Sequence, residues 1–173
     1  MDRLSRLLGI PVAAVCGSLA VAAPARADNK FSLDVGAAFP TGAGNDDGFG
    51  LGLRYGHEWD LAILSLTPEL GVGYHAFSGP NDANVFTALG GGRVALGFVL
   101  EPSVYAHAGV GHVWTDTTSF TSLAYDVGAA LDLTAIPVIA FGPHITLGGV
   151  AGNEGRRPFS WMEIGGHLTL NVP

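Results

Sequence analysis

The sequence predicts an all-β protein: an eight-stranded, antiparallel, up-and-down transmembrane β-barrel that follows a cleaved signal peptide. Three observations lead to this prediction. The chain opens with a secretory leader, apolar residues then alternate with polar or small residues, and the connections between the alternating runs are in turn long and short. Such connections indicate strands that run up and down, with loops at one end of the barrel and tight turns at the other.

The first residues have the three-part form of a secretory signal peptide. Arg3 and Arg6 precede an apolar run, and the segment ends in the letters ARA, a small-residue cleavage site. We therefore expect a signal peptide at 1–27 and one barrel domain at 28–173. Because Cys16 is the only cysteine of the chain, the exported domain contains none, and we expect no disulfide.

The predicted domain is acidic. Removing the leader takes three of the 8 Lys and Arg residues and one of the 15 Asp and Glu residues, which leaves 5 basic against 14 acidic residues and a net charge near −9. Nucleic acid is therefore not an expected partner. No remaining stretch approaches the roughly 20 apolar residues of a membrane helix, so the hydrophobic residues must be spread over other elements.

Period-two alternation accounts for these hydrophobic residues. In the run 30–40 large apolar side chains occupy the odd positions, and the even positions are polar or small. The pattern recurs along the domain and gives each run one apolar and one polar face, as in a strand. Turn signals divide the domain into eight such runs, at 30–40, 49–59, 64–77, 85–98, 102–115, 124–134, 138–150 and 159–172.

The connections and the polar face favour a membrane barrel over a soluble one. TGAGNDD, SGPNDAN, TDTTSFTS and GNEGRRP are polar connections, whereas WDLAIL, VLEP and TAIP are short. A soluble lipocalin-like barrel would turn its apolar face inward. Here the opposite face holds charges, hydroxyls and many glycines, which do not form a dry core, so we expect the apolar face to contact lipid.

With this pattern, 28–173 resembles the small eight-stranded outer-membrane proteins of Gram-negative bacteria, the porin-like group of the OmpA domain, OmpX and OmpW-like barrels. The last strand, FSWMEIGGHLTLNV, resembles the C-terminal signal read by the barrel-assembly machinery, but Pro173 stands where an aromatic residue is usual. The resemblance implies a monomer in the outer membrane, with its N-terminus on the periplasmic side. Its implied partners are outer-membrane lipid and lipopolysaccharide and, during biogenesis, the assembly machinery.

The implied function is a structural or surface-interaction role, with limited passage of small solutes or ions left open. Side chains just fill an eight-stranded interior, so a wide diffusion channel is not expected. The alternatives are an outer-membrane lipid-modifying hydrolase and a soluble secreted or periplasmic lipocalin-like binding barrel. We expect no enzyme, cofactor or metal, because phosphate-loop, nucleophile-elbow and H-E-x-x-H motifs are absent and Ser160 and His167 fall on opposite faces.

Charged residues on the polar faces predict an interior charge belt. Reflecting neighbouring strands about their turns sets acidic and basic side chains opposite one another, and it makes Arg54 the hub between Asp34 and Glu69. An unpaired charge in a narrow lumen costs several kcal/mol, so we expect these pairs to be structural. The belt comprises Asp34, Arg54, Glu69, Arg93, His107, Asp132, His144 and His167.

The histidines of the belt have expected partners too. The same reflection sets Arg93 against His107 and brings Asp132 near His107. His144 and His167 are expected to face each other inside the barrel, where two ligands do not complete the tetrahedron of zinc without a carboxylate. His57 and His112 fall near aromatic residues at strand ends, and we expect both to belong to an aromatic girdle at the membrane interface.

Overall fold

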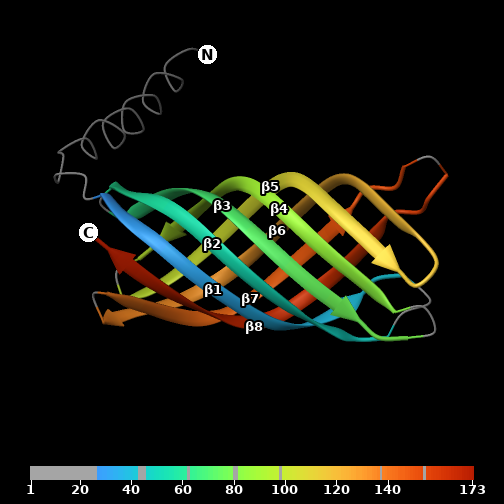
Figure 1. The fold of residues 1–173 in the computed structure, drawn as a ribbon. Helices are drawn as coiled ribbons and strands as arrows, with labels where there is room; N and C mark the ends of the chain where they lie inside the picture. The colour runs from blue at the N-terminus through green and yellow to red at the C-terminus, as the bar shows by residue number, and fades with distance from the viewer. Residues whose placement is uncertain are drawn as a thin grey trace, which may run out of the picture.

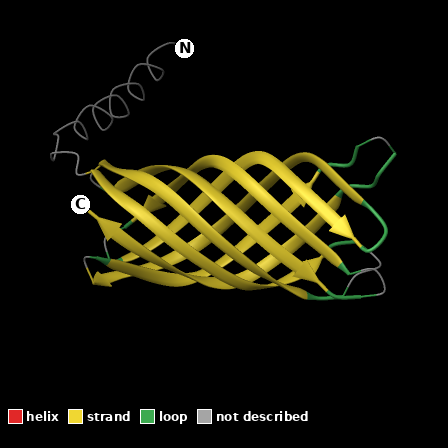
Figure 2. Cartoon of the chain, in the orientation of Figure 1, coloured by secondary structure: helices red, strands yellow, loops and turns green. Residues whose placement is uncertain are grey.

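The computed structural model describes residues 27–42, 46–61, 63–79, 82–97, 99–136, 138–153 and 155–173. They form a closed barrel in which each strand pairs with the next and the last pairs with the first (Figure 1). Figure 2 shows strands joined by loops and turns. The strands are β1 (Ala27–Pro40), β2 (Gly48–Leu61), β3 (Leu64–Phe77), β4 (Ala83–Leu96), β5 (Leu100–Thr115), β6 (Ser119–Ile136), β7 (Ile139–Val150) and β8 (Phe159–Val172).

This architecture confirms the predicted fold class. All neighbouring strands are antiparallel, including the pair that closes the barrel, in which β1 runs from Asn29 opposite Val172 to Pro40 opposite Trp161. No described residue belongs to a helix long and apolar enough to cross a membrane. The predicted signal peptide lies outside the described residues except for Ala27, which opens β1.

The predicted runs match the strands to within about three residues, apart from β6. The sequence places TDTTSFTS in a loop, but β6 already begins at Ser119. The connection is a tight turn in which the N–H of Thr115 donates to the carbonyl of Thr118 at 2.8 Å. Phe120 continues the ladder opposite Val113. Threonine and aromatic side chains favour strands, so a polar stretch containing them does not mark a loop.

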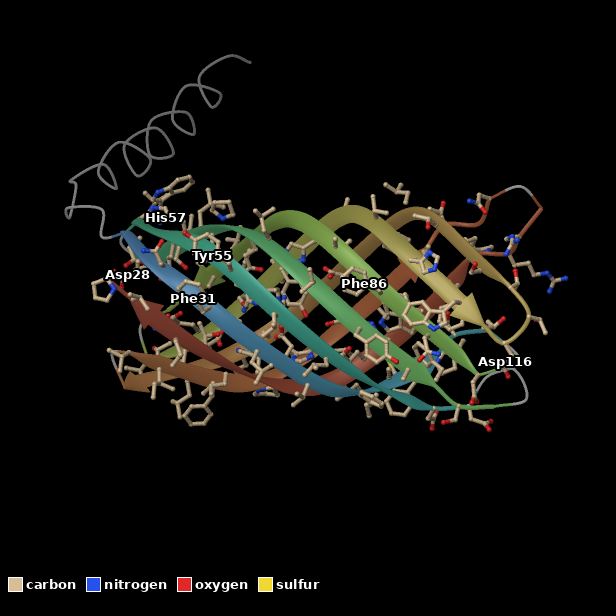
Figure 3. All side chains as sticks on the ribbon, viewed as in Figure 1. Asp28, Phe31, Tyr55, His57, Phe86 and Asp116 are labelled. Atoms are coloured by element: carbon tan, nitrogen blue, oxygen red, sulfur yellow. The ribbon has the colours of Figure 1, made fainter. Side chains whose placement is uncertain are left out.

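The two ends of the barrel differ, as the connections predict. We call the end with the longer connections the loop end and the other the turn end. In Figure 3, Phe31, Tyr55 and His57 lie toward the turn end, where β1 begins and β8 ends, and Asp116 lies at the loop end. The loop-end connections are 41–47, 78–82, 116–118 and 151–158, and those of the turn end are 62–63, 97–99 and 137–138.

The outer face of the barrel is apolar. The side chains expected to contact lipid are all exposed, from 38% for Leu131 to 56% for Leu53. A soluble binding barrel has the reverse arrangement, with its apolar face inward. The exposed side chains expected at the lipid are Leu33, Val35, Leu51, Leu53, Val72, Val127, Leu131, Ile145 and Leu168.

Aromatic residues gather on this outer face at both ends of the strands. Near the turn end the rings of His57 and Trp59 are 5.8 Å apart, and near the loop end His112 stacks on Trp114 at 5.6 Å. Tyr74 adds a second ring contact to Trp114 at 6.1 Å. Such rings mark the two interfaces of a membrane. Both histidines therefore occupy the girdle positions expected from the sequence.

An arginine on the outer face should destabilise the barrel in a depth-dependent way. Val127 pairs with Ala106 and Leu147 in mid-strand, whereas Leu131 pairs with Pro102 closer to the turn end. We expect Val127→Arg to lower the free energy of unfolding in liposomes by about 2–4 kcal/mol, and Leu131→Arg by less. Guanidinium titrations followed by tryptophan fluorescence measure both. Parental stability for Val127→Arg would mean that this face does not contact lipid.

The inner position next to Val127 is not a neutral control. From the sequence, a wet lumen would accommodate a charged residue at Gly128, but this expectation is wrong. A Cβ atom at Gly128 would lie 2.5 Å from the ring of Tyr105 and 2.5 Å from the carbonyl oxygen of Ile145. Because the ring of Tyr105 fills this part of the lumen, even alanine at Gly128 requires the ring to move.

Candidate functional site in the barrel interior

The belt residues all point into the lumen, although the strand register differs from the one expected. Arg54 lies opposite Ser32, and Asp34 lies opposite Gly52. For the strand pairs of the belt, the residue opposite a given position lies two positions away from the partner that reflection about the expected turn gives. A shift of two leaves every side chain on its face, because the strand period is two. Seven members are at most 7% exposed, namely Asp34, Glu69, Arg93, His107, Asp132, His144 and His167, and Arg54 is partly buried.

The acidic and basic members form ion pairs, and Glu69 is their hub. Arg54 binds Asp34 through two hydrogen bonds, Nε to Oδ2 at 2.9 Å and Nη2 to Oδ1 at 2.5 Å. Its distance to Glu69 is longer, 3.9 Å from Nη1 to Oε2. Glu69 also accepts from Arg93 Nε at 2.9 Å and lies 3.0 Å from His107 Nε2. Arg54 thus pairs with both Asp34 and Glu69 as expected, but Glu69 has more partners, since it meets three cationic or imidazole groups.

His107 and Asp132 do not meet, contrary to the expectation from the sequence. His107 Nδ1 lies 2.6 Å from Asp126 Oδ1 on the directly opposite position of β6. Asp132 instead binds Nε2 of His167 and lies 3.4 Å from Nη1 of Arg93. Arg93 likewise contacts Glu69 and Asp132 rather than His107. The two-residue shift places Arg93 opposite Tyr105 instead of His107, whereas Asp132 lies opposite Glu101, six positions from the partner of His107.

Tyr105 lies among the guanidinium groups of the belt. The guanidinium carbon of Arg54 is 4.8 Å from the centre of its ring, and that of Arg93 is 5.1 Å away. Both distances allow cation–π attraction. The Tyr105 hydroxyl is 2.6 Å from Thr146 Oγ1 across the lumen. Tyr105 therefore fills the centre of the barrel and separates two like charges.

A second cluster, not expected from the sequence, surrounds Glu163. Its Oε2 lies 2.7 Å from Nε2 of His75, and its Oε1 lies 2.9 Å from Nε2 of His144. The rings of His144 and His167 are 5.8 Å apart, so this cluster joins the belt. Reflection of adjacent strands could not find the contact with His75, because β3 and β8 face each other across the lumen. The inward parity of β3 was the available signal, since His75 shares it with Glu69.

An apolar plug closes the interior at the loop end. It consists of one or two buried side chains from each of β1 and β3 to β8, and the ring centres of Phe77 and Trp161 are 6.3 Å apart within it. The sequence predicts a polar interior throughout, and this is wrong at the loop end. The plug residues are Ala38, Phe77, Ala83, Val85, Val113, Ala124, Val150 and Trp161.

The space left inside the barrel is small. A cavity of about 60 Å³ is lined by plug and belt residues, among them Trp161, His75, Tyr105, Arg54 and Asp34. One water molecule needs a cavity volume of roughly 10–15 Å³, so this cavity holds a few waters. It is too small for a sugar or an amino acid.

The two residues considered for a hydrolase lie apart. Ser160 Oγ is 2.6 Å from Thr41 Oγ1 at the loop end, whereas His167 is buried beside Asp132 in the belt. No hydrogen bond joins Ser160 to a histidine among the described residues. A serine nucleophile requires its base within hydrogen-bond reach, and the partner of Ser160 in the described part of the chain is Thr41.

Comparisons with known proteins support the fold. No protein-family model matches the chain, and no curated protein matches its sequence. The crystal structure of Neisserial surface protein A is similar at a TM-score of 0.67, with 12% identity over 84% of this chain and 98% of that one. The outer membrane enzyme PagL matches at 0.59, with 16% identity over 82% and 98% of the two chains. Ail, the attachment invasion locus protein of Yersinia pestis, matches at 0.52, with 11% identity over 84% and 99%. This chain has the fold of the small eight-stranded outer-membrane β-barrels.

Proposed function

We propose that the protein is an integral outer-membrane protein of a Gram-negative bacterium whose barrel is a sealed anchor and whose loop end is the interacting surface. The observation that carries this proposal is the filled interior. The apolar plug lies across one end and the belt of ion pairs occupies the middle, which leaves a cavity for a few waters only. A barrel with this interior offers no path for solutes. Its function is therefore to anchor the chain in the bilayer and to present the loops at the loop end.

The surroundings of such a barrel follow from its faces. Outer-membrane lipid and lipopolysaccharide cover the apolar outer face, and the barrel-assembly machinery inserts it. Asp46, Asp47, Asp82 and Asp116 are exposed at the loop end, and this acidic surface suits cationic partners. The names of two similar proteins, a surface protein and an attachment invasion locus protein, fit a surface role. We expect a monomer, since every strand edge is paired within the chain.

Conductance tests the sealed interior. We expect planar bilayers containing the protein to show no ion current above that of lipid alone between pH 5 and 8. The Phe77→Ala, Trp161→Ala double variant removes the two largest plug side chains at the loop end, and it should also show no current, because the belt still fills the middle of the barrel. A steady current through the parent protein would contradict the sealed barrel. It would favour limited solute passage.

A lipid-modifying hydrolase is the second candidate, favoured by the similarity in fold to PagL, described as an outer membrane enzyme. Comparing lipid A from cells with and without the protein tests it directly. We expect identical lipid A masses, since the Ser160 hydroxyl pairs with Thr41 and with no histidine in the described ranges. Loss of an acyl chain that depends on the protein and disappears in Ser160→Ala would establish the enzyme instead.

A further inference from the structure

Three inward side chains from three adjacent strands come together on the closing side of the barrel. Asp34 of β1 lies directly opposite His167 of β8, and His144 of β7 lies diagonally across from His167. The ligating atoms of these three side chains all lie within 4.8 Å of one another. Each residue is at most 5% exposed. We propose that Asp34, His144 and His167 bind a divalent transition-metal ion, with Zn²⁺ as the representative ion.

The ring nitrogens of the two histidines support this proposal. Nε2 of His144 lies 2.9 Å from Glu163, and Nε2 of His167 is bonded to Asp132. Each Nε2 therefore donates its proton to a carboxylate. The Nδ1 atoms of both rings are buried and have no hydrogen-bond partner among the described residues. A carboxylate on one ring nitrogen and a free lone pair on the other is the arrangement that metal-binding histidines have in proteins.

Asp34 can supply the third ligand while it stays bound to Arg54. The Arg54 guanidinium donates one hydrogen bond to each Asp34 oxygen. A carboxylate accepts at about four lone-pair positions, so further positions remain. Arg54 then orients Asp34 just as Glu163 and Asp132 orient the two histidines. Glu163 and Asp132 do not supply this third ligand, because each is already the partner of a histidine Nε2.

The charge of the interior also favours a bound cation. In the part of the chain that the structure describes, six carboxylates take part in the interior ion pairs (Asp34, Glu58, Glu69, Asp126, Asp132 and Glu163), against three Lys and Arg side chains (Lys30, Arg54 and Arg93). His107 has a carboxylate at each ring nitrogen, which fits an imidazolium that donates twice. Carboxylates therefore outnumber cationic side chains in these ion pairs, and a bound cation would offset the excess of negative charge.

The donor set indicates the class of metal. Two imidazoles and one carboxylate, completed by water, form a common tetrahedral zinc site with an open fourth position. The interior cavity, which Asp34 and His144 help to line, provides room for that water. Mg²⁺ and Ca²⁺ prefer ligands that are all oxygen atoms, so they do not suit a site with two imidazoles. The site should therefore bind Zn²⁺ or Co²⁺ and discriminate against Mg²⁺ and Ca²⁺.

Metal uptake by the detergent-folded protein, made without a polyhistidine tag, tests the site. The protein is folded in the presence of a chelator, dialysed against Zn²⁺ and then freed of unbound metal. Mass spectrometry measures the amount of zinc that stays bound to the protein. We expect about one zinc per barrel, and visible bands of tetrahedral Co²⁺ when cobalt replaces zinc. Mg²⁺ should not displace either ion. A parent protein that retains no zinc and gives no such cobalt bands would overturn the proposal.

Variants separate this site from adventitious binding. His144→Ala and His167→Ala should lose the zinc, and Glu163→Gln should weaken zinc binding about 10–100-fold by altering the partner of His144. The matched control is the His57→Ala, His112→Ala double variant, whose histidines lie on the outer face, and it should bind as the parent does. Different mobilities of boiled and unboiled samples show that each variant is folded. Uptake by folded His144→Ala and His167→Ala equal to that of the parent would disprove the assignment. If the alanine variants do not fold, the conservative variant Asp34→Asn serves as the test. It should bind less zinc than the parent.

Discussion

Replacing Arg54 with alanine is expected to lower the free energy of unfolding by about 3–5 kcal/mol, the cost of leaving a buried charge without its partner. Asp34 is 4% exposed, and both its oxygens accept from Arg54. Glu69 keeps Arg93 and His107 when Arg54 is removed. The variant therefore isolates one acid rather than the two that the sequence suggests. Guanidinium unfolding of the barrel in liposomes, with chelator present, measures the loss.

Two controls make this measurement specific. Arg157→Ala should have little effect, because Arg157 is exposed. Arg156, which the sequence places in a solvated loop, is a poorer control, since it donates to the carbonyl of Ser119 at 2.7 Å. The Arg54→Met, Asp34→Leu double variant removes both charges and should be more stable than Arg54→Met. Equal midpoints for Arg54→Ala and Arg157→Ala would show that the belt does not stabilise the barrel.

Trp161→Ala is the second change with a large expected effect, again about 3–5 kcal/mol, since it leaves a cavity in a packed cluster. Trp161 is 3% exposed, its ring centre is 4.5 Å from that of His75, and it packs against Phe77 and Phe159. Trp59→Ala is the matched control, because Trp59 is 43% exposed on the outer face. Unfolding free energies in liposomes distinguish the two. A loss for Trp59→Ala as large as that for Trp161→Ala would mean that the plug is not tightly packed.

The strands and their faces follow from the sequence because a strand has a period of two. Parity alone places Leu33 and Leu53 outward and Asp34 inward, as the structure has them, and an even error in register changes none of these assignments. The alternation of long and short connections likewise predicts which strand ends lie together. Fold, faces and belt membership are therefore local properties of the chain.

The contacts between belt residues could not be predicted in the same way. They depend on the tilt of the strands and on which side chains cross the lumen, and neither is encoded in one strand. Thus Asp132 meets His167 instead of His107, and His75 reaches Glu163 from the far wall. The sequence pattern does not reveal the apolar plug, because each contributing strand supplies only one or two residues, such as Phe77, near its loop end. Such a cluster exists only once the barrel is closed.

The pairing of β1 with β8 determines when these interior contacts can form. Ser32 and Thr169, whose hydroxyl oxygens are 2.7 Å apart, are separated by 137 positions in the chain. Contacts between residues so far apart in the sequence form slowly, because the intervening chain must first be ordered. Until β8 is present, β1 also keeps an open edge, and hydrocarbon offers no water to satisfy its backbone groups. Insertion and closure are therefore one cooperative event, and a chain that stops before Phe159 loses the whole barrel instead of one strand.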